Sequence, residues 1–321
     1  IRPFCARVAA VPYTQFEHSA EQALAFVGDV PIDIVHYEWP RLLTVYDRRL
    51  GARHLFTYME AVSLRLRRDL DGHSPLSPAW TRTFAELVGA LGTELHETGA
   101  MDGRIVVTRQ DGEFLAGLSP RADYAIMNHG ITLDGFALPD TAPEPNRLLF
   151  VGNFGHYPNE DAMRFFLGRV YPQVRRAVPQ VRLSIVGANP TPWLLCQQNG
   201  DDITVEGQVD DIPPAIQRAA VCLAPLVSGA GIRTKVIQYA ALRRPCVATS
   251  IAAADLLFVD GESVAIADDA AAMAARTIHL LSHPDEAREL AAQAYEVAGR
   301  HYDNRRLIRH LYAYYDRLEG H

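Results

Sequence analysis

Short runs of β-branched and apolar residues alternate with longer stretches whose apolar residues recur at helical spacing. In the first half of the chain this pattern predicts buried strands at residues 31–36 and 103–108, with helices at 59–70 and 80–91 between them. Strands that alternate with amphipathic helices form parallel sheets built from β-α-β units. The pattern therefore predicts an α/β protein with parallel sheets.

The second half of the chain repeats the alternation after a segment without periodicity. That segment, 138–146, is rich in proline and polar residues and is the predicted linker. We therefore expect two domains, 1–140 and 147–321, close to the usual ~150 residues per domain. Expected strands of the second domain are 148–152, 182–187, 203–206, 220–225 and 245–249, and expected helices are 159–169, 213–219, 234–242, 270–281 and 284–298.

Three of these strands run directly into loops that contain glycine. The loops begin at Gly152-Asn153, at Gly187 and at Ser228-Gly229-Ala230-Gly231. Ligands of open parallel sheets bind outside the carboxyl ends of the strands, so we expect the three loops to converge on one crevice.

Lys235 is the only lysine among 31 basic side chains, and it stands where the third loop enters a helix. A strand, a glycine-rich turn and a helix together aim backbone N–H groups and a helix N-terminus at a phosphate. A lysine ammonium acts there as a compact point charge, unlike the planar arginine fork. The sequence therefore predicts a phosphate site at Lys235; the alternative is a lysine-poor composition that spared one surface residue.

The composition argues against several classes of protein. The net charge of −7 argues against a general nucleic-acid binder, which needs a basic face. The four cysteines are scattered without CxxC spacing, which is typical of reduced thiols in a cytoplasmic protein. No apolar run approaches the ~20 residues of a membrane span. Because the chain opens Ile1-Arg2-Pro3, we expect native sequence, including the first strand of domain one, to precede it.

Several segments of the second half resemble the donor domain of GT-B glycosyltransferases of the family 4-like group, also called glycosyl transferases group 1. They are 150–154, 157–162, 185–187, 205–211, 224–241 and 244–249. The first half is similar in outline, at 33–36 and 127–130. The resemblance implies two Rossmann-like domains facing across a cleft. It also implies that 304–318 forms a terminal helix that packs back on the first domain, although a helix on its own domain is equally compatible with the spacing.

The resemblance further implies a hexosyltransferase that moves a sugar from a nucleotide diphosphate donor, UDP- or GDP-linked, with retention at the anomeric carbon. It implies no cofactor and no metal, and an acceptor that is a small molecule, a glycan or a lipid-linked group. Catalytic roles fall to Lys235 and Arg233 on the diphosphate and to His36 on the sugar or acceptor, although His36 is equally well explained as a strand cap. Donor-binding roles fall to Gly152, Asn153, Gly187, Gln208, Val209, Gly229, Ala230, Gly231, Ile232 and Gln238.

The chain departs from this family where two glutamates usually stand eight residues apart. Ala230 and Gln238 occupy those places, and His129 stands where asparagine is usual. Gln238 retains the hydrogen-bonding capacity to hold a ribose, whereas Ala230 cannot bind a sugar hydroxyl. Two alternatives therefore stay open: a nucleotide-sugar epimerase or hydrolase of the same fold, and a non-catalytic relative that binds sugar nucleotides.

Other charged groups have plainer explanations. Asp69-Leu70-Asp71 matches a metal-binding DxD, but its arginine-rich surroundings indicate a solvated helix end. His279 and His283 have metal-ligand spacing, but with no carboxylate or cysteine evident to complete a site we predict no metal. Arginines concentrated in the first domain suggest an anionic acceptor or a peripheral contact with an anionic membrane. They are Arg41, Arg48, Arg49, Arg53, Arg65, Arg67 and Arg68.

Overall fold

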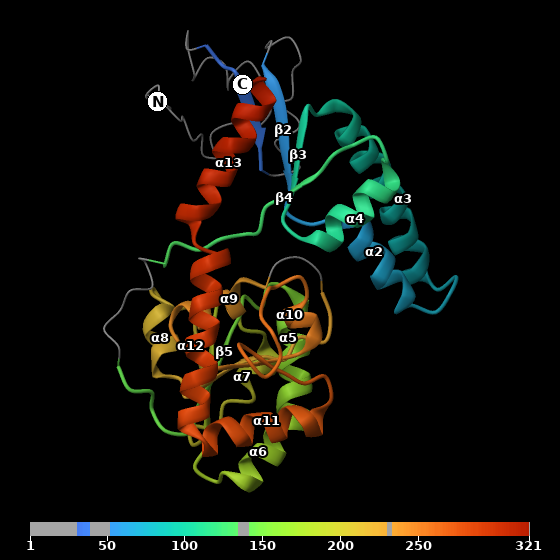
Figure 1. Cartoon of the computed structure of the whole chain (residues 1–321). Helices are drawn as coiled ribbons and strands as arrows, with labels where there is room; N and C mark the ends of the chain where they lie inside the picture. Colours follow the sequence, from blue (N-terminus) through green and yellow to red (C-terminus); the bar gives the residue numbers. More distant parts are fainter. Residues whose placement is uncertain (1–30, 39–51, 134–140, 230–232, 321) are drawn as a thin grey trace. The chain divides into compact units, whose positions relative to one another are not determined.

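The computed structural model describes residues 31–38, 52–133, 141–229 and 233–320, in two compact units (Figure 1). One unit comprises Ile1–Met127 with His310–His321, and the other comprises Asn128–Arg309. In the described residues each unit is built on a sheet whose strands are all parallel. The predicted α/β class with parallel sheets is confirmed.

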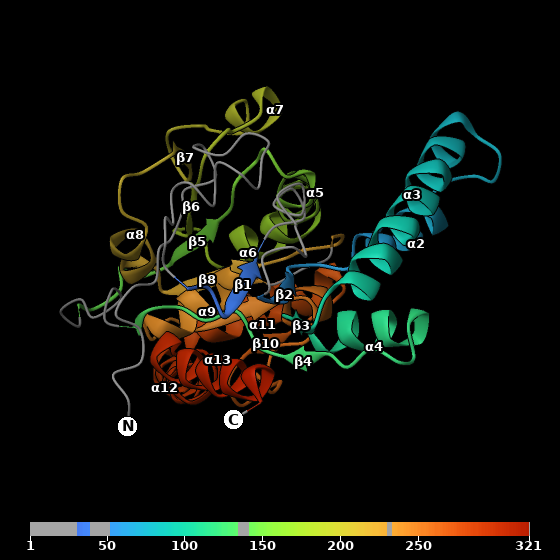
Figure 2. The same cartoon turned by 90° about the horizontal axis from the view of Figure 1, so that it is seen from above.

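The sheet of the first unit has the order β1-β2-β3-β4. Its strands are β1 (Ile34–Tyr37), β2 (Arg53–Tyr58), β3 (Gly103–Val106) and β4 (Ala125–Ile126). Three helices, α2 (Val62–Asp71), α3 (Pro78–Ala100) and α4 (Arg109–Leu118), lie together on one side of the strands in Figures 1 and 2. The sequence predicted β1, β3, α2 and α3 but missed β2, β4 and α4.

Helix α3 is longer than its apolar pattern predicted. Ser77 caps its first turn by accepting a hydrogen bond from Trp80 N at 3.1 Å. Beyond residue 91 the helix buries polar side chains, including Glu94, which accepts hydrogen bonds from Ser63 on α2. Burial, reinforced by the charge of Glu94, raises the pKa of Glu97 to about 7. Apolar periodicity could not extend the helix because its last turns bury carboxyl groups instead of hydrocarbon.

The sheet of the second unit has the order β10-β9-β8-β5-β6-β7. The strands are β5 (Arg147–Val151), β6 (Arg182–Val186), β7 (Ile203–Gly207), β8 (Val221–Ala224), β9 (Cys246–Ala248) and β10 (Ala265–Ile266). The first five agree with the predicted strands to within one residue at each end. Continuous apolar runs made them recognisable, because the central strands of a parallel sheet are covered on both faces.

The helices of this unit connect the strands and form its outer layers. They are α5 (Tyr157–Phe165), η5 (Phe166–Val170), α6 (Tyr171–Ala177), α7 (Pro192–Leu195), α8 (Pro213–Arg218), α9 (Thr234–Ala241), α10 (Ser250–Ala253), α11 (Ala270–Ser282) and α12 (Pro284–His301). The predicted helix 159–169 is a short α-helix continued by a π-helical turn at Phe166–Val170.

The strand order places one topological switch point in the sheet of the second unit. From β5 the chain moves outward to β6 and β7, then returns to β8 beside β5 and moves the other way to β9 and β10. The loops that follow β5 and β8 therefore diverge, and it is outside the carboxyl ends of the strands at such a point that open α/β sheets bind ligands.

The terminal helix α13 (Asn304–Glu319) contacts the first unit through its second half. Tyr315 Oη lies 2.7 Å from Nδ1 of His36, whose Nε2 lies 2.7 Å from Oγ1 of Thr57. Tyr314 Oη accepts a hydrogen bond from Arg104 N at 3.0 Å. Residues 310–319 thus complete the first unit.

We expect Tyr315→Phe to destabilise the protein by about 1–3 kcal/mol, because it leaves a largely buried ring nitrogen of His36 without its partner. Urea denaturation measures the effect. Tyr295→Phe on α12 is the matched control, because it keeps the ring that stacks with Arg243, and we expect it to change stability by less than about 0.5 kcal/mol. Equal stability of the two variants would contradict this role of Tyr315.

Candidate functional site

The loops that follow β5, β6 and β7 are joined by backbone hydrogen bonds. Gly152 N donates to Val186 O at 3.0 Å, and Gly187 N donates to Gly207 O at 2.7 Å. Farther out, Phe154 N donates to Ala188 O at 2.9 Å. These bonds continue the sheet beyond the strands and hold the loops side by side.

Glycine is required at two positions of these loops. A Cβ on Gly187, whose φ is +148°, would lie 1.8 Å from the carbonyl oxygen of Gly152. Gly229, in the loop after β8, has φ +102°, and a Cβ there would lie 3.0 Å from Cγ of Pro158 at the start of α5. Only glycine adopts such backbone angles without strain. The three glycine loops therefore lie close to one another, as the sequence predicted.

Lys235 extends from the first turn of α9 to the other side of the switch point. Its Nζ donates to Oδ1 of Asn159 on α5 at 2.7 Å. The same atom stands 4.1 Å from the centroid of the Phe150 ring on β5, a cation–π distance. The ammonium thus contacts both strand β5, through Phe150, and the helix that follows it, through Asn159.

The surroundings of the ammonium disfavour its charged form. Burial, together with repulsion from the Arg233 guanidinium, lowers the pKa of Lys235 to about 7, while the Cys246 thiol acts in the opposite direction. The lysine keeps some exposed surface, and its ammonium lies against the Phe150 ring and the Asn159 amide. Its polar contact within the described residues is a neutral amide oxygen and not a carboxylate. Such a site gains most from an incoming anion, which would compensate the buried charge.

A chain of asparagines fixes the partner of Lys235. Asn159 Nδ2 donates to Asn153 O at 2.8 Å. The Asn153 side chain in turn accepts hydrogen bonds from Gly155 N at 2.9 Å and from Asn189 Nδ2 at 3.0 Å. Asn159 is therefore oriented by the loops after β5 and β6, with its amide oxygen toward the ammonium.

Sequence reasoning gave no role to Phe150 or Asn159, although both lie in segments that resemble the glycosyltransferase donor domain. The available signal was Asn159 directly after Pro158, at the start of a predicted helix beside a glycine loop. Ser228 Oγ also donates to Asp161 Oδ2 at 3.2 Å, which joins the loop after β8 to α5.

The other predicted donor-binding residues are distributed around this centre. Arg233 is buried at the N-cap position of α9, and Gln238 is half-buried one turn after Lys235. Gln208 is exposed just after β7, where Val209 packs against the core. Ala230, Gly231 and Ile232 lie outside the described residues.

His36 lies in the first unit and is engaged within it. Both ring nitrogens have protein partners, Tyr315 and Thr57. Burial lowers the pKa of His36 to about 4, so the ring is neutral at physiological pH. In this arrangement His36 connects β1 to the terminal helix, and its role on the sugar or acceptor stays a prediction.

Arg65 of α2 forms ion pairs with two acidic side chains. Arg65 lies 3.3 Å from Asp69 and 3.4 Å from Glu60. Asp71 is exposed at the last residue of α2, so the DxD sequence is a solvated helix end, as predicted.

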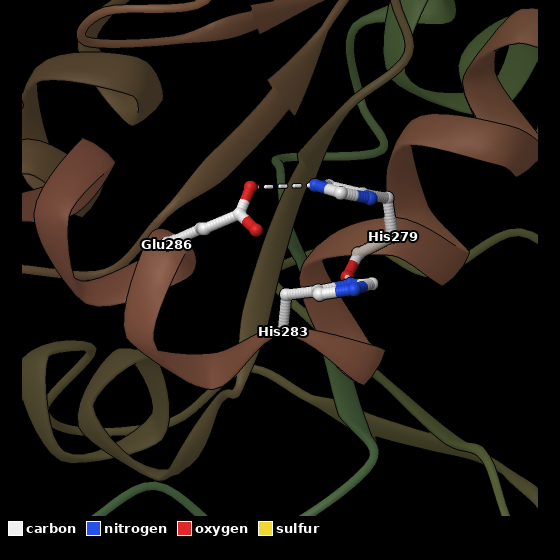
Figure 3. Close-up of side chains that lie close together, drawn as sticks. All are labelled: His279, His283 and Glu286. Atoms are coloured by element: carbon white, nitrogen blue, oxygen red, sulfur yellow. Dashed lines mark hydrogen bonds and ion pairs between the residues drawn. The ribbon is translucent and has the colours of Figure 1, made fainter.

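The prediction that no carboxylate lies near His279 and His283 is wrong. Glu286, from the first turn of α12, supplies a carboxylate 2.8 Å from Nε2 of His279 (Figure 3). Proline 284 separates the histidines from Glu286 in sequence, and the turn that it begins brings them together.

None of the described helices combines the length and apolar character that crossing a bilayer requires.

We expect Lys235→Met to raise the stability of the unliganded protein, because it removes a charge from an enclosed site. The wild-type pKa is about 7 when folded and 10.5 ordinarily. Wild-type stability therefore rises with pH between these values, where the unfolded chain holds a proton that the folded chain releases. Urea denaturation at about pH 6.5 should show the variant's full advantage, which should shrink at about pH 9.5. An advantage independent of pH, or none at all, would contradict the burial of the charge.

Known proteins match the chain in family and in fold. Residues 145–283 match the sequence model of the family described as glycosyl transferases group 1. A search of the curated proteins found no relative that matches. Among solved structures, sucrose-phosphate synthase from Thermosynechococcus elongatus is 18% identical, with a TM-score of 0.68 over 93% of this chain and 77% of that one.

Two other solved structures show the same fold at lower identity. HepE from Anabaena, in complex with UDP, is 11% identical, with a TM-score of 0.67 over 88% of this chain and 78% of that one. TarM from S. aureus is 11% identical, with a TM-score of 0.65 over 90% of this chain, which spans only 55% of its length. Residues 145–283 therefore match the family of glycosyl transferases group 1, and the chain has the fold of the GT-B glycosyltransferases.

Proposed function

We propose that the protein transfers a hexose from a nucleoside diphosphate donor to an acceptor hydroxyl, with retention at the anomeric carbon and without a required metal. One observation carries the proposal: the enclosed ammonium of Lys235 at the switch point between β5 and β8. The family and the fold, both those of glycosyltransferases, support the reaction class.

Lys235 is suited to a leaving diphosphate. When the bond between sugar and phosphate breaks, negative charge develops on the diphosphate oxygens. A fixed cation aimed at that charge stabilises the transition state more than the ground state. Two unit charges ~4 Å apart interact by about 4 kcal/mol at an effective dielectric near 20. The hydrogen bond to Asn159 fixes the ammonium before the donor arrives, so little reorganisation is needed.

The surrounding residues complete a donor site in this proposal. Arg233 shares the diphosphate with Lys235, and its charge already acts on that lysine. Gln238 binds the ribose, while Gln208 and Val209 flank the base with main-chain groups. The loops bring backbone groups to the diphosphate and sugar through Gly152, Asn153, Gly187, Gly229, Ala230, Gly231 and Ile232.

We propose UDP as the first donor nucleotide to test and GDP as the second. The Anabaena HepE structures contain UDP and UDP-glucose, which shows that a protein of this fold accepts them. No further cofactor is part of the proposal. Where a sugar hydroxyl usually meets glutamate, Ala230 leaves no acceptor, so sugar selection depends on other groups.

The proposed acceptor is a small molecule, a glycan or a lipid-linked group, in glycan or glycoconjugate biosynthesis in the cytoplasm. Arg67 and Arg68 are exposed on α2 and supply positive charge for a peripheral membrane contact. Sedimentation with anionic and with neutral liposomes tests that contact, and equal recovery from both would remove it.

We expect Lys235→Ala to reduce turnover at least about tenfold, as for loss of one preorganised charge donor. Sugar transfer is measured with UDP- and GDP-sugars and a panel of acceptors. Arg243→Gln is the matched control, because it removes an exposed cation at the opposite end of α9, where Arg243 stacks on Tyr295.

Three outcomes would contradict parts of this proposal. Unchanged turnover in Lys235→Ala would reject the role of the lysine. Product that forms equally without acceptor would indicate an epimerase or hydrolase. Tight nucleotide binding without turnover of any acceptor would indicate a non-catalytic relative, for which Ala230 and Gln238 are the supporting residues.

We expect the affinity for UDP to fall as the pH rises above about 7. In the unliganded protein the pKa of Lys235 is about 7, and a bound diphosphate raises it. Binding at higher pH therefore requires Lys235 to take up a proton. The affinity for UDP should fall by close to about tenfold per pH unit. Isothermal titration between about pH 7.5 and about pH 9 measures it. Lys235→Met should bind UDP weakly and without this trend; a parallel trend in both proteins would assign the proton to another group.

A further inference from the structure

We propose that His279, His283 and Glu286 form a zinc-binding site that joins the end of α11 to the first turn of α12. This site is separate from the proposed sugar transfer and does not depend on it. Figure 3 shows the two imidazole rings one above the other, with the Glu286 carboxylate beside them. Their ligand atoms all lie within 4.8 Å of one another.

The local chain geometry creates this cluster. His279 lies in the last turn of α11, and His283 both ends α11 and precedes α12. The two rings stack with centroids 4.2 Å apart and planes at 23°. Pro284 begins α12 directly, so Glu286 falls in its first turn, where a negative charge is favoured by the helix dipole. The start of α12 therefore positions the Glu286 carboxylate even when no zinc is bound.

The tautomer of His283 is set for metal binding. Its Nδ1 lies 2.9 Å from the carbonyl oxygen of His279. A carbonyl oxygen only accepts, so Nδ1 must carry the proton, and in the neutral ring the lone pair is on Nε2. A backbone carbonyl on the other ring nitrogen is the usual support of a metal-binding histidine.

The donor set indicates the ion. Two imidazole nitrogens and one carboxylate oxygen are the ligands that Zn²⁺ takes in three-residue sites, with water in the fourth position. All three side chains are exposed, so the ion has free entry and room for that water. Without a metal, His279 and Glu286 form an exposed hydrogen-bonded pair, of the kind that contributes about 0–1 kcal/mol.

Zinc in this position would stabilise the fold. An ion that binds the three side chains only when the helices are in place adds to the stability of the folded state. Helix α12 packs against α9, the helix that bears Lys235. A zinc ion that fixes the start of α12 would therefore support α9 without contacting Lys235.

Titration of the EDTA-stripped protein with zinc chloride tests the proposal. We expect saturable binding of one zinc ion per chain by calorimetry. The melting temperature should rise by roughly 3 °C for each tenfold increase of free zinc above its dissociation constant. Magnesium chloride should have no such effect, because Mg²⁺ prefers oxygen ligands. In the same protein Co²⁺ should give the visible absorption of a tetrahedral site.

Matched variants locate the binding. His283→Gln and Glu286→Gln should each weaken zinc binding at least tenfold and abolish the thermal shift, while both stay folded without zinc. His301→Gln and Cys196→Ser remove exposed potential ligands elsewhere in the second unit and should bind zinc as the wild type does. Absence of saturable binding, or binding that persists in His283→Gln and Glu286→Gln, would overturn the assignment.

Discussion

The site depends on one constraint: a lysine ammonium held between an aromatic ring and an amide oxygen, where its charge is poorly solvated. Lys235 reaches this position because β8 lies beside β5 in the sheet. Helices α9 and α5, which follow these two strands, therefore begin close to each other. Phe150 and Asn159 then meet the ammonium from the β5 side. A cation in such surroundings weakens the unliganded fold and favours an anionic ligand.

The rest of the second unit serves this arrangement. Gly187 allows the loop after β6 to lie against the carbonyl of Gly152, which no side chain would permit. That contact sets the position of Asn153, and Asn153 sets the orientation of Asn159. The ammonium is therefore placed by a continuous series of backbone and amide contacts.

Sequence reasoning predicted five strands of the second unit and singled out Lys235 for physical reasons. Buried parallel strands are continuous apolar runs, and a lone lysine after a glycine loop is unusual in an arginine-rich chain. Helix α3 was underestimated because its final turns bury Glu94 and Glu97, which break the apolar pattern. Strand β2 was missed where the chain emerges from an arginine-rich stretch, although all but its first residue is buried.

Contacts between distant segments were beyond pattern analysis. The partners of Lys235 lie 76 residues or more away in sequence, and only the strand order brings them together. Both nitrogens of His36 are satisfied by Thr57 and by Tyr315, a residue 279 positions away, which no local pattern reveals. Glu286 escaped notice for a simpler reason: the turn at Pro284 hid its proximity to His279.

A crystal structure of the protein soaked with a UDP-sugar tests the central claim most directly. The account predicts a diphosphate at the carboxyl ends of β5 and β8, with Nζ of Lys235 about 2.7–2.9 Å from a phosphate oxygen. A donor bound elsewhere, or an ammonium that still contacts only Asn159 and Phe150 while the nucleotide is present, would contradict it.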